Sequence, residues 1–233
     1  MSSVLNAGFK GDQAQITIYI PTFNRAETLG RAIRSALAQK LFEPTIQILV
    51  LDDGSTDETN SILKLYENDV TIKKFSKNRG IGWISFNALS IIETEYFVRL
   101  DSDDFFGVDF LRVLSPIARH ANPKFDVISC NYLQVDEREF RSEILDLSGT
   151  TDLQNFGAGM LFKTASVVAA GGYDKNLRTR EDLDLHLKLE KVGALRFHVP
   201  VPLYRRYVRG DNLSLKNEHK TKKIGMIRDA KKI

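Results

Sequence analysis

The first hundred residues alternate between short apolar stretches and longer segments in which apolar residues recur every three or four positions. The apolar stretches are rich in β-branched and aromatic side chains, which predicts strands, and they cover residues 16–20, 46–51, 70–75 and 96–100. The segments between them predict helices, and they cover residues 26–40, 57–68 and 80–93. Because each helix must cross from one strand to the next, the sequence predicts an α/β fold with a mostly parallel sheet and helices on both faces.

The second half of the sequence is less regular. Its predicted elements are helices at 109–120 and 163–170, strands at 125–135 and 158–162, and a segment at 138–147 that fits neither type better. Residues 183–189 alternate between Leu and polar side chains, which is the pattern of a half-buried strand. Leu, Lys and Glu are good helix formers, however, and Gly193 follows where a helix would end. We therefore expect a helix there.

Charge is unevenly distributed along the chain. Residues 216–233 contain seven Lys or Arg and two Asp or Glu. The rest of the chain contains 26 Lys or Arg and 28 Asp or Glu, which gives it a net charge of −2. We expect one domain at 1–214 and a basic tail at 215–233. A slightly acidic domain argues against nucleic-acid binding. The tail is either a solvated terminus or a peripheral contact with anionic lipid.

The sequence favours a cytoplasmic location, with the tail as the candidate contact to the inner face of the membrane. Cys130 is the only cysteine, so no intrachain disulfide forms, and its apolar neighbours predict a buried thiol. The first residues lack the basic and apolar segments of a signal peptide. No apolar stretch has the length of a membrane span. The oligomeric state stays open.

An acidic turn, Asp101-Ser102-Asp103, directly follows the predicted strand at 96–100. Two carboxylates at this spacing offer hard oxygen ligands to Mg²⁺ or Mn²⁺, which share their other positions with water and with substrate phosphates. The turn therefore predicts a metal-assisted site for a nucleoside diphosphate. A solvated acidic loop is the alternative for so short a motif.

Polar residues also follow the first predicted strand. Thr22, Asn24 and Arg25 offer a hydroxyl, an amide and a guanidinium that can meet a phosphate or a ribose. The alternative is that Asn24 is only the N-cap of the next helix.

Two further loops carry similar chemistry. Asp52-Asp53-Gly54 follows the second strand, where a carboxylate can accept from a base or a ribose and glycine lets the backbone approach closely. Asn78-Arg79-Gly80 opens a helix, and helix N-termini attract phosphate. The latter loop has the ending of neither a P-loop nor a dinucleotide fingerprint. Since ligands of parallel sheets bind beyond the carboxyl ends of the strands, we expect all these loops at one edge.

Together these motifs resemble family 2 glycosyltransferases. The matching segments, in order and spacing, are 18–25, 50–57, 78–80 and 100–104, and the resemblance extends over 16–214. It implies a GT-A fold, with a Rossmann-like, mostly parallel sheet flanked by helices and a smaller mixed acceptor-side region. It also implies a nucleotide-sugar donor such as a UDP-sugar, a Mn²⁺ or Mg²⁺ ion, and inversion at the anomeric carbon. The expected acceptor is a glycan or a lipid-linked precursor in polysaccharide biosynthesis.

The resemblance assigns donor roles to residues at the matching positions. Asp53 is expected to contact the base, Asp101 the ribose or the donor sugar, and Asp103 the metal on the diphosphate. The other positions expected to line the nucleotide are Pro21, Thr22, Asn24, Arg25, Asn78 and Ser102.

Later segments match the acceptor side of the family. Gly159 lies in a segment similar to the acceptor-side strand, and Glu181-Asp182 lies in one similar to the second conserved block. The Asp of that pair is the general base in the family, so we expect Asp182 to take the acceptor's proton. The alternative is that both acids only favour a helix N-terminus.

Two positions depart from the family's pattern. Phe86 stands where many relatives have Arg, and Tyr207 where many have a His on the metal or the diphosphate. The candidates to neutralise the diphosphate instead are Arg205, Arg206 and Arg209. Two other functions stay open: a non-catalytic nucleotide- or glycan-binding relative, and a sugar nucleotidyltransferase. The latter would be expected to carry a glycine-rich basic loop after its first strand.

Overall fold

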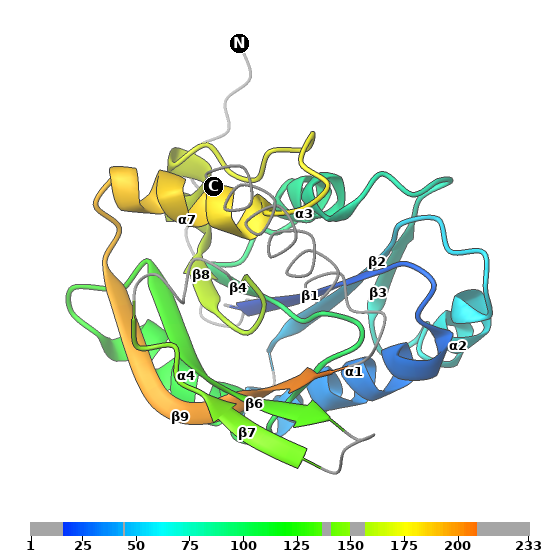
Figure 1. Ribbon diagram of the computed structural model, residues 1–233, viewed down its shortest axis with the longest axis horizontal. Coiled ribbons are helices and arrows are strands. Elements are labelled where there is room, and N and C mark those ends of the chain that lie inside the picture. Colours follow the sequence, from blue (N-terminus) through cyan, green and yellow to red (C-terminus); the bar gives the residue numbers. More distant parts are fainter. Residues whose placement is uncertain (1–15, 44, 137–140, 150–156, 209–233) are drawn as a thin grey trace, which may run out of the picture.

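The N-terminal half forms the parallel part of one sheet. The computed structural model describes residues 16–43, 45–136, 141–149 and 157–208. Its first four strands are β1 (Ile16–Thr22), β2 (Gln47–Asp52), β3 (Thr71–Lys74) and β4 (Tyr96–Arg99). They lie in the order β3-β2-β1-β4 and all pair in parallel, as the sequence predicts (Figure 1). Their carboxyl ends therefore lie at the same edge of the sheet.

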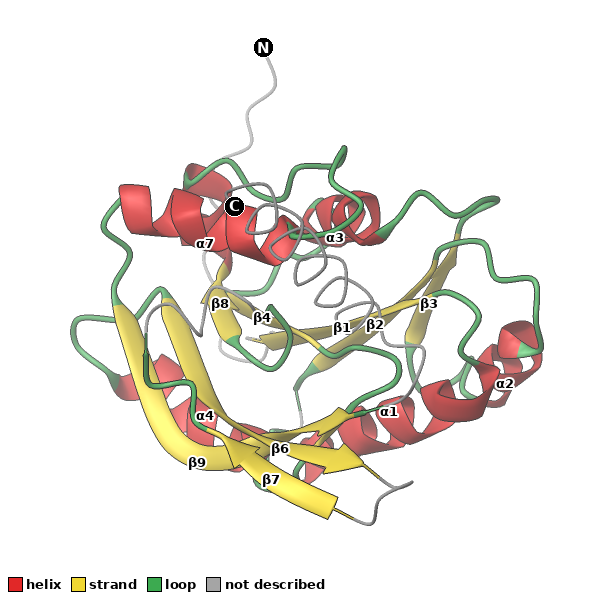
Figure 2. Cartoon of the chain, in the orientation of Figure 1, coloured by secondary structure: helices red, strands yellow, loops and turns green. Residues whose placement is uncertain are grey.

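Helices cover both faces of these strands (Figure 2). Those of the first half are α1 (Ala26–Ala38), α2 (Thr59–Leu65) and α3 (Ile81–Leu89), with a 3₁₀ turn, η1 (Gln39–Leu41), after α1. Helices α1 and α2 lie on one side, and α3 shares the other side with α7 (Glu181–Lys191). The predicted elements are confirmed, and α2 and α3 are shorter than the sequence indicates.

The second half extends the sheet with mixed pairing. Its elements are β5 (Phe105–Phe106), α4 (Phe110–His120), β6 (Val127–Asp136), β7 (Arg141–Leu145), β8 (Leu161–Lys163), α6 (Thr164–Ala169), α7 and β9 (Arg196–Tyr207). Strand β8 pairs antiparallel with β4 and β6, while β9 pairs parallel with β6 and antiparallel with β5. The segment at 138–147, left open by the sequence, contains strand β7. None of the described helices is long and apolar enough to cross a membrane.

Two segments show where local patterns succeed and fail. Residues 183–189 are helical, as expected, and α7 buries Leu185 and Leu189 while Leu187 is exposed. Strand β9 has no clear signal in the sequence because it contains Pro200 and Pro202, and proline is rare inside sheets. The pairing of β6 with β9 shifts register at this point, which accommodates the prolines.

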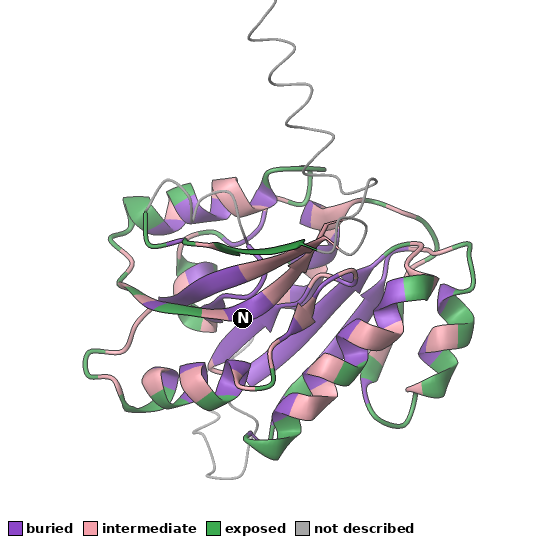
Figure 3. Cartoon of the chain, turned by 60° about the horizontal axis from the view of Figure 1, so that its bottom comes forward, coloured by how far each residue is buried: buried purple, intermediate pink, exposed green. Residues whose placement is uncertain are grey.

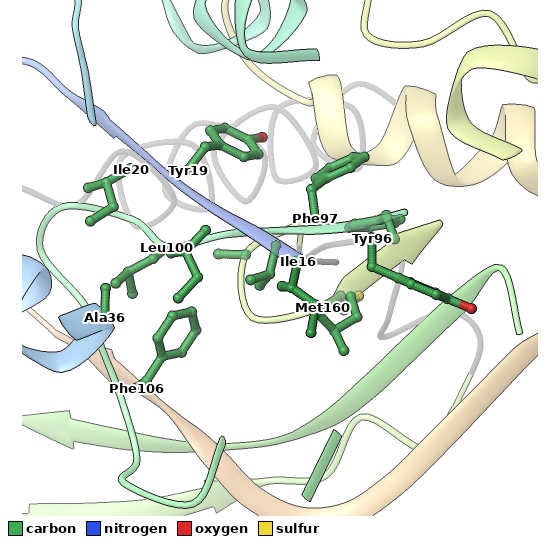
Figure 4. Close-up of a cluster of buried hydrophobic side chains, with 14 of the residues drawn as sticks. Ile16, Tyr19, Ile20, Ala36, Tyr96, Phe97, Leu100, Phe106 and Met160 are labelled. Carbon is green, nitrogen blue, oxygen red and sulfur yellow. The ribbon is translucent and has the colours of Figure 1, made fainter. Parts of the chain in front are cut away.

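The core lies on both faces of β1 and β4 (Figure 3). Alternation along β1 points Ile20 to the side of α1 and Tyr19 to the side of α7, where Phe97 of β4 also points (Figure 4). The ring of Phe97 lies 6.0 Å from that of Tyr19 and 5.6 Å from that of Phe162. Cys130 is buried, as predicted. Arg99, two residues after Phe97, therefore also faces α7.

Candidate active site

Asn24 joins the loops that follow β1 and β2. Its N–H donates to Ser55 Oγ (2.9 Å), and its Oδ1 accepts from the N–H of Thr56 (2.8 Å). The alternative of Asn24 as an N-cap is wrong, because Arg25 occupies that position and the first N–H of α1, that of Ala26, donates to Asp57 Oδ2 (3.2 Å). The amide of Asn24 instead holds the neighbouring loop, and its φ of 51° makes this approach feasible.

Asp53 joins the loop after β2 to the loop before α3. Its carboxylate is nearly buried and accepts from the N–H groups of Arg79 (3.0 Å) and Gly80 (2.8 Å). Burial raises the pKa of Asp53, and these hydrogen bonds oppose the rise. Asn78 lies half-buried in the same loop. The contact of Asp53 with a base stays a prediction, since its oxygens already serve the loop.

The end of β1 presents two buried residues to the same edge. Pro21 pairs with Leu51, and Thr22 pairs with Asp52. Thr22 is 3% exposed, and its Oγ1 has no hydrogen-bond partner among the described residues. Most buried hydroxyls are hydrogen-bonded, so this atom is a candidate for contact with a ligand.

The acidic turn lies beside the loop that follows β1. Asp103 Oδ2 is 3.5 Å from Arg25 Nε, and Arg31 Nη2 donates to the carbonyl oxygen of Asp103 (3.0 Å). Ser102 is buried within the turn. Asp101 Oδ1 lies 2.9 Å from Arg99 Nε. The loops after β1, β2 and β4 therefore meet, as the sequence predicts.

Strand β9 anchors this turn, which sequence reasoning missed. Tyr204 Oη donates to Asp104 Oδ2 (2.7 Å) and accepts from the N–H of Asp101 (3.3 Å). The N–H of Tyr207 donates to Asp104 Oδ1 (2.7 Å). The guanidinium of Arg31 lies 4.0 Å from the ring centroid of Tyr207. The only available signal was a third acid, Asp104, directly after the motif.

The two acids predicted for the acceptor side, Glu181 and Asp182, lie in the first turn of α7. Glu181 Oε1 accepts from Arg99 Nη1 (2.7 Å), and both side chains are buried. Asp182 is adjacent, and its Oδ1 accepts from the N–H of Leu183 (2.8 Å). Burial and, after it, the charge of Glu181 raise the pKa of Asp182, whereas Arg99 lowers it, and the net pKa is about 6. The carboxylate of Asp182 is thus more basic than an exposed Asp.

Gly159 packs against β9 and β4. Its N–H donates to the carbonyl oxygen of Arg99 (2.8 Å), and its φ is 67°. A Cβ at this position would lie 2.5 Å from the ring of Tyr204. Close packing alone therefore requires glycine here, and a contact of Gly159 with the acceptor stays a prediction.

Phe86, which departs from the family's pattern, and the arginines expected near the diphosphate contact other residues of the chain. Phe86 is exposed on α3, and the ammonium of Lys175 lies 5.7 Å from its ring centroid. Arg205 Nη1 donates to the carbonyl oxygen of Pro202, and Arg206 Nη1 donates to Gln134 Oε1 (2.9 Å). Arg209 and the tail at 215–233 lie outside the described residues.

The acidic turn fits a metal that enters with its substrate. Within the described part of the chain, no three His, Cys, Asp or Glu side chains are placed to hold an ion by themselves. Mg²⁺ and Mn²⁺ on nucleotide phosphates need only one or two protein carboxylates. Asp103, whose side chain is 17% exposed at the edge of the sheet, meets that requirement.

Solved structures with similar folds are glycosyltransferases. The structure of S. aureus TarS 1–349 in complex with UDP-GlcNAc has a TM-score of 0.71 at 20% identity, over 85% of this chain and 60% of that one. Mannosyltransferase PcManGT from Pyrobaculum calidifontis, in complex with GDP-Man and Mn²⁺, has a TM-score of 0.67 at 19% identity, over 86% and 59%. These similarities define the GT-A fold, which confirms the predicted fold class.

Sequence comparisons identify the family to which the chain belongs. A family profile described as "Glycosyl transferase family 2" matches residues 17–169, and the chain belongs to this family. Chondroitin synthase of Pasteurella multocida (strain Pm70) is 30% identical over 223 residues, which cover 89% of this chain and 22% of the synthase. Hyaluronan synthase of Pasteurella multocida is 29% identical over 216 residues, which cover 86% and 21%. The chain spans about a fifth of the length of these two relatives.

Proposed function

We propose that this protein is an inverting glycosyltransferase that transfers a sugar from a UDP-sugar to a hydroxyl group of a glycan or a lipid-linked acceptor. The observation that carries the proposal is the meeting of the acidic turn and the start of α7 at one buried side chain. Arg99 lies 2.9 Å from Asp101 and 2.7 Å from Glu181, although Arg99 and Glu181 are 82 positions apart. A donor-side turn and an acceptor-side carboxylate pair thereby border the same reaction centre.

The nucleotide binds along the carboxyl ends of β1, β2 and β4. There, Thr22 Oγ1 is buried without a partner among the described residues, and a ribose or phosphate group can supply one. Asp53 holds the loop before α3 against the base, and Asp101 meets the ribose or the donor sugar. The remaining contacts come from Pro21, Asn24, Arg25, Asn78 and Ser102. The similar TarS structure with UDP-GlcNAc supports a uridine nucleotide.

Asp103 would hold the Mn²⁺ or Mg²⁺ ion that accompanies a donor diphosphate. When bound, this ion supplies Lewis-acid stabilisation for the charge that develops on the leaving diphosphate. Arg25, whose Nε is 3.5 Å from Asp103 Oδ2, adds a positive charge at the same place.

Asp182 is the general base. With a pKa of about 6 it is ionised at neutral pH and still basic enough to accept a proton. The acceptor oxygen forms a bond to the anomeric carbon while its proton passes to Asp182. The bond from the anomeric carbon to the diphosphate oxygen breaks on the opposite face of the sugar, and the nucleoside diphosphate leaves. Attack and departure on opposite faces invert the configuration.

The test replaces the base while leaving the donor site intact. Asp182→Asn should lower transfer by about 10²-fold or more, because general-base catalysis contributes that much, and donor affinity should stay close to that of the parent. Asp184→Asn is the matched control, since Asp184 lies on the same helix and pairs with Lys188 at 2.7 Å. Transfer by the Asp182→Asn protein at the parent rate would refute the proposed base.

The sugar and the acceptor follow from binding experiments. Because a ligand that binds only the folded protein raises its melting temperature, a panel of UDP- and GDP-sugars with Mn²⁺ identifies the donor. The relatives named chondroitin and hyaluronan synthase favour a polysaccharide acceptor. Labelled nucleoside triphosphate with a sugar phosphate tests the nucleotidyltransferase alternative. A protein that binds nucleotide sugar and neither hydrolyses nor transfers it would instead be the non-catalytic relative.

A further inference from the structure

Arg99 is a buried cation between the two halves of the candidate site. It is 5% exposed, and the alternation along β4 points it toward α7. Its Nη1 donates to Glu181 Oε1 in a short hydrogen bond (2.7 Å). Its Nε lies 2.9 Å from Asp101 Oδ1, close enough for an ion pair but without the alignment of a hydrogen bond. One guanidinium thus contacts a carboxylate on each side.

Gly157 and Gly159 pack closely against this arrangement. A Cβ on Gly157 would lie 2.8 Å from Cβ of Asp182 and 3.4 Å from Nη2 of Arg99. The N–H of Gly159 donates to the carbonyl oxygen of Arg99 (2.8 Å). Arg99 is therefore fixed at its backbone and at its side chain, and Asp182 lies directly beside the same short segment.

The charges around Asp182 come from two elements. On α7, Glu181 is the like charge, and the other charged neighbours are Arg99 at the end of β4 and Asp101 in the turn after it. Burial, Glu181 and Asp101 favour the protonated form of Asp182, whereas Arg99 favours the ionised form. Arg99 keeps its own proton, because its neighbouring carboxylates raise its pKa further. Among the charged neighbours of Asp182, it is the one that supports the state needed to accept a proton.

We propose that Arg99 is a positioning residue that joins the donor-side turn to the start of α7 and acts on sugar transfer through Asp182. The proposal rests on the proposed function, because it takes Asp182 as the base. Arg99 itself does not touch the reacting atoms. Its guanidinium orients Glu181 and Asp101 and keeps Asp182 ionised at the pH of catalysis.

The test is the pH profile of kcat in five variants, each shown to be folded by circular dichroism across the pH range. Asp182→Asn comes first, because its loss of transfer establishes the base independently. Arg99→Gln should then move the acidic limb of the profile to higher pH, because it removes the positive charge that favours the ionised form of Asp182. Glu181→Gln should move it to lower pH, because a like charge is removed.

Two further variants separate positioning from plain structural support. Arg99→Lys keeps the charge but cannot bridge two carboxylates as a fork, so it should restore the parent limb while kcat stays reduced. Arg196→Gln is the control for losing a partly buried arginine, since Arg196 Nη1 lies 3.0 Å from His186 Nδ1 and Arg196 is not among the charges that shift the pKa of Asp182. It should lower the melting temperature and leave the limb unchanged.

The outcomes are distinguishable. If the Arg99→Gln protein has a lower kcat but the same acidic limb in its pH profile as the parent, the inference is overturned and the proposed function stands. If Arg99→Gln does not fold, Arg99→Lys decides: a kcat equal to that of the parent overturns the inference, and a reduced kcat with the parent's acidic limb supports it. If Asp182→Asn transfers sugar at the parent rate, the proposed function itself fails.

Discussion

The hydroxyl of Tyr204 offers a sharp test of how strand β9 supports the acidic turn. In Tyr204→Phe the ring keeps its packing against Tyr132, 4.7 Å between centroids, and against Phe106, 5.9 Å. Only the oxygen is lost, which donates to Asp104 Oδ2 and accepts from the N–H of Asp101. Asp104 keeps one hydrogen bond, from the N–H of Tyr207.

The size of the effect follows from this loss. A buried polar group that loses its partner costs about 1–3 kcal/mol, and we expect about 2 kcal/mol for Tyr204→Phe. For a chain of this length that corresponds to a fall in melting temperature of about 4–8 °C. Because the turn also carries Asp101 and Asp103, nucleotide-sugar affinity in the presence of Mn²⁺ should fall too.

The assays are thermal and urea unfolding, followed by calorimetric titration with the nucleotide sugar. Tyr66→Phe is the control, since Tyr66 Oη bonds to the exposed side chain of Arg34 (2.9 Å) outside the site, and its effect should stay within about 0.5 kcal/mol. A Tyr204→Phe protein that has the melting temperature of the parent and binds the donor equally well would refute the role given to the hydroxyl.

Three other changes have defined outcomes. Asp103→Ala should weaken nucleotide-sugar binding in Mn²⁺ and leave binding in EDTA nearly unchanged; equal losses in both titrations would contradict the metal assignment. Gly54→Ala should destabilise the fold by about 2 kcal/mol or more in urea unfolding, because φ is +78° and the new Cβ would lie 2.6 Å from Cα of Lys77; unchanged stability would count against it. Asp182→Asn should raise the melting temperature at pH 8 and not at pH 4. The folded-state pKa of about 6 exceeds the ordinary value of 3.8, so this group's favourable contribution is present at low pH and is lost as the pH rises through 6; no gain at pH 8 would contradict the raised pKa.

Much of the fold is predictable from local patterns. Strands β1, β2, β3 and β4 follow from β-branched and aromatic runs, and their parallel order follows from the helices between them. That order places the loops with Asp53 and Asp101 at one edge. Helix α7 was correctly predicted because helix propensity outweighed its alternating leucines.

The contacts by which β9 holds the acidic turn in place were not predictable from the sequence. Strand β9 contains prolines at a shift of register, and its pairing with β6 joins residues about 70 positions apart. Tyr204 and Tyr207 therefore reach Asp104 through contacts that no local pattern encodes. The role of Asn24 in joining two loops was missed for the same reason, since its partner, Thr56, lies in another loop.

The sequence by itself determined where the strands and helices of the first half form and that acidic and polar residues follow those strands, because periodicity and propensity act over a few neighbouring residues. The tertiary structure decided what those acids can do. Asp182 is basic because α7 buries it beside Glu181, and Arg99 opposes that effect from β4. Burial and charge proximity are properties of segments far apart in the chain, so they exist only once the chain has folded.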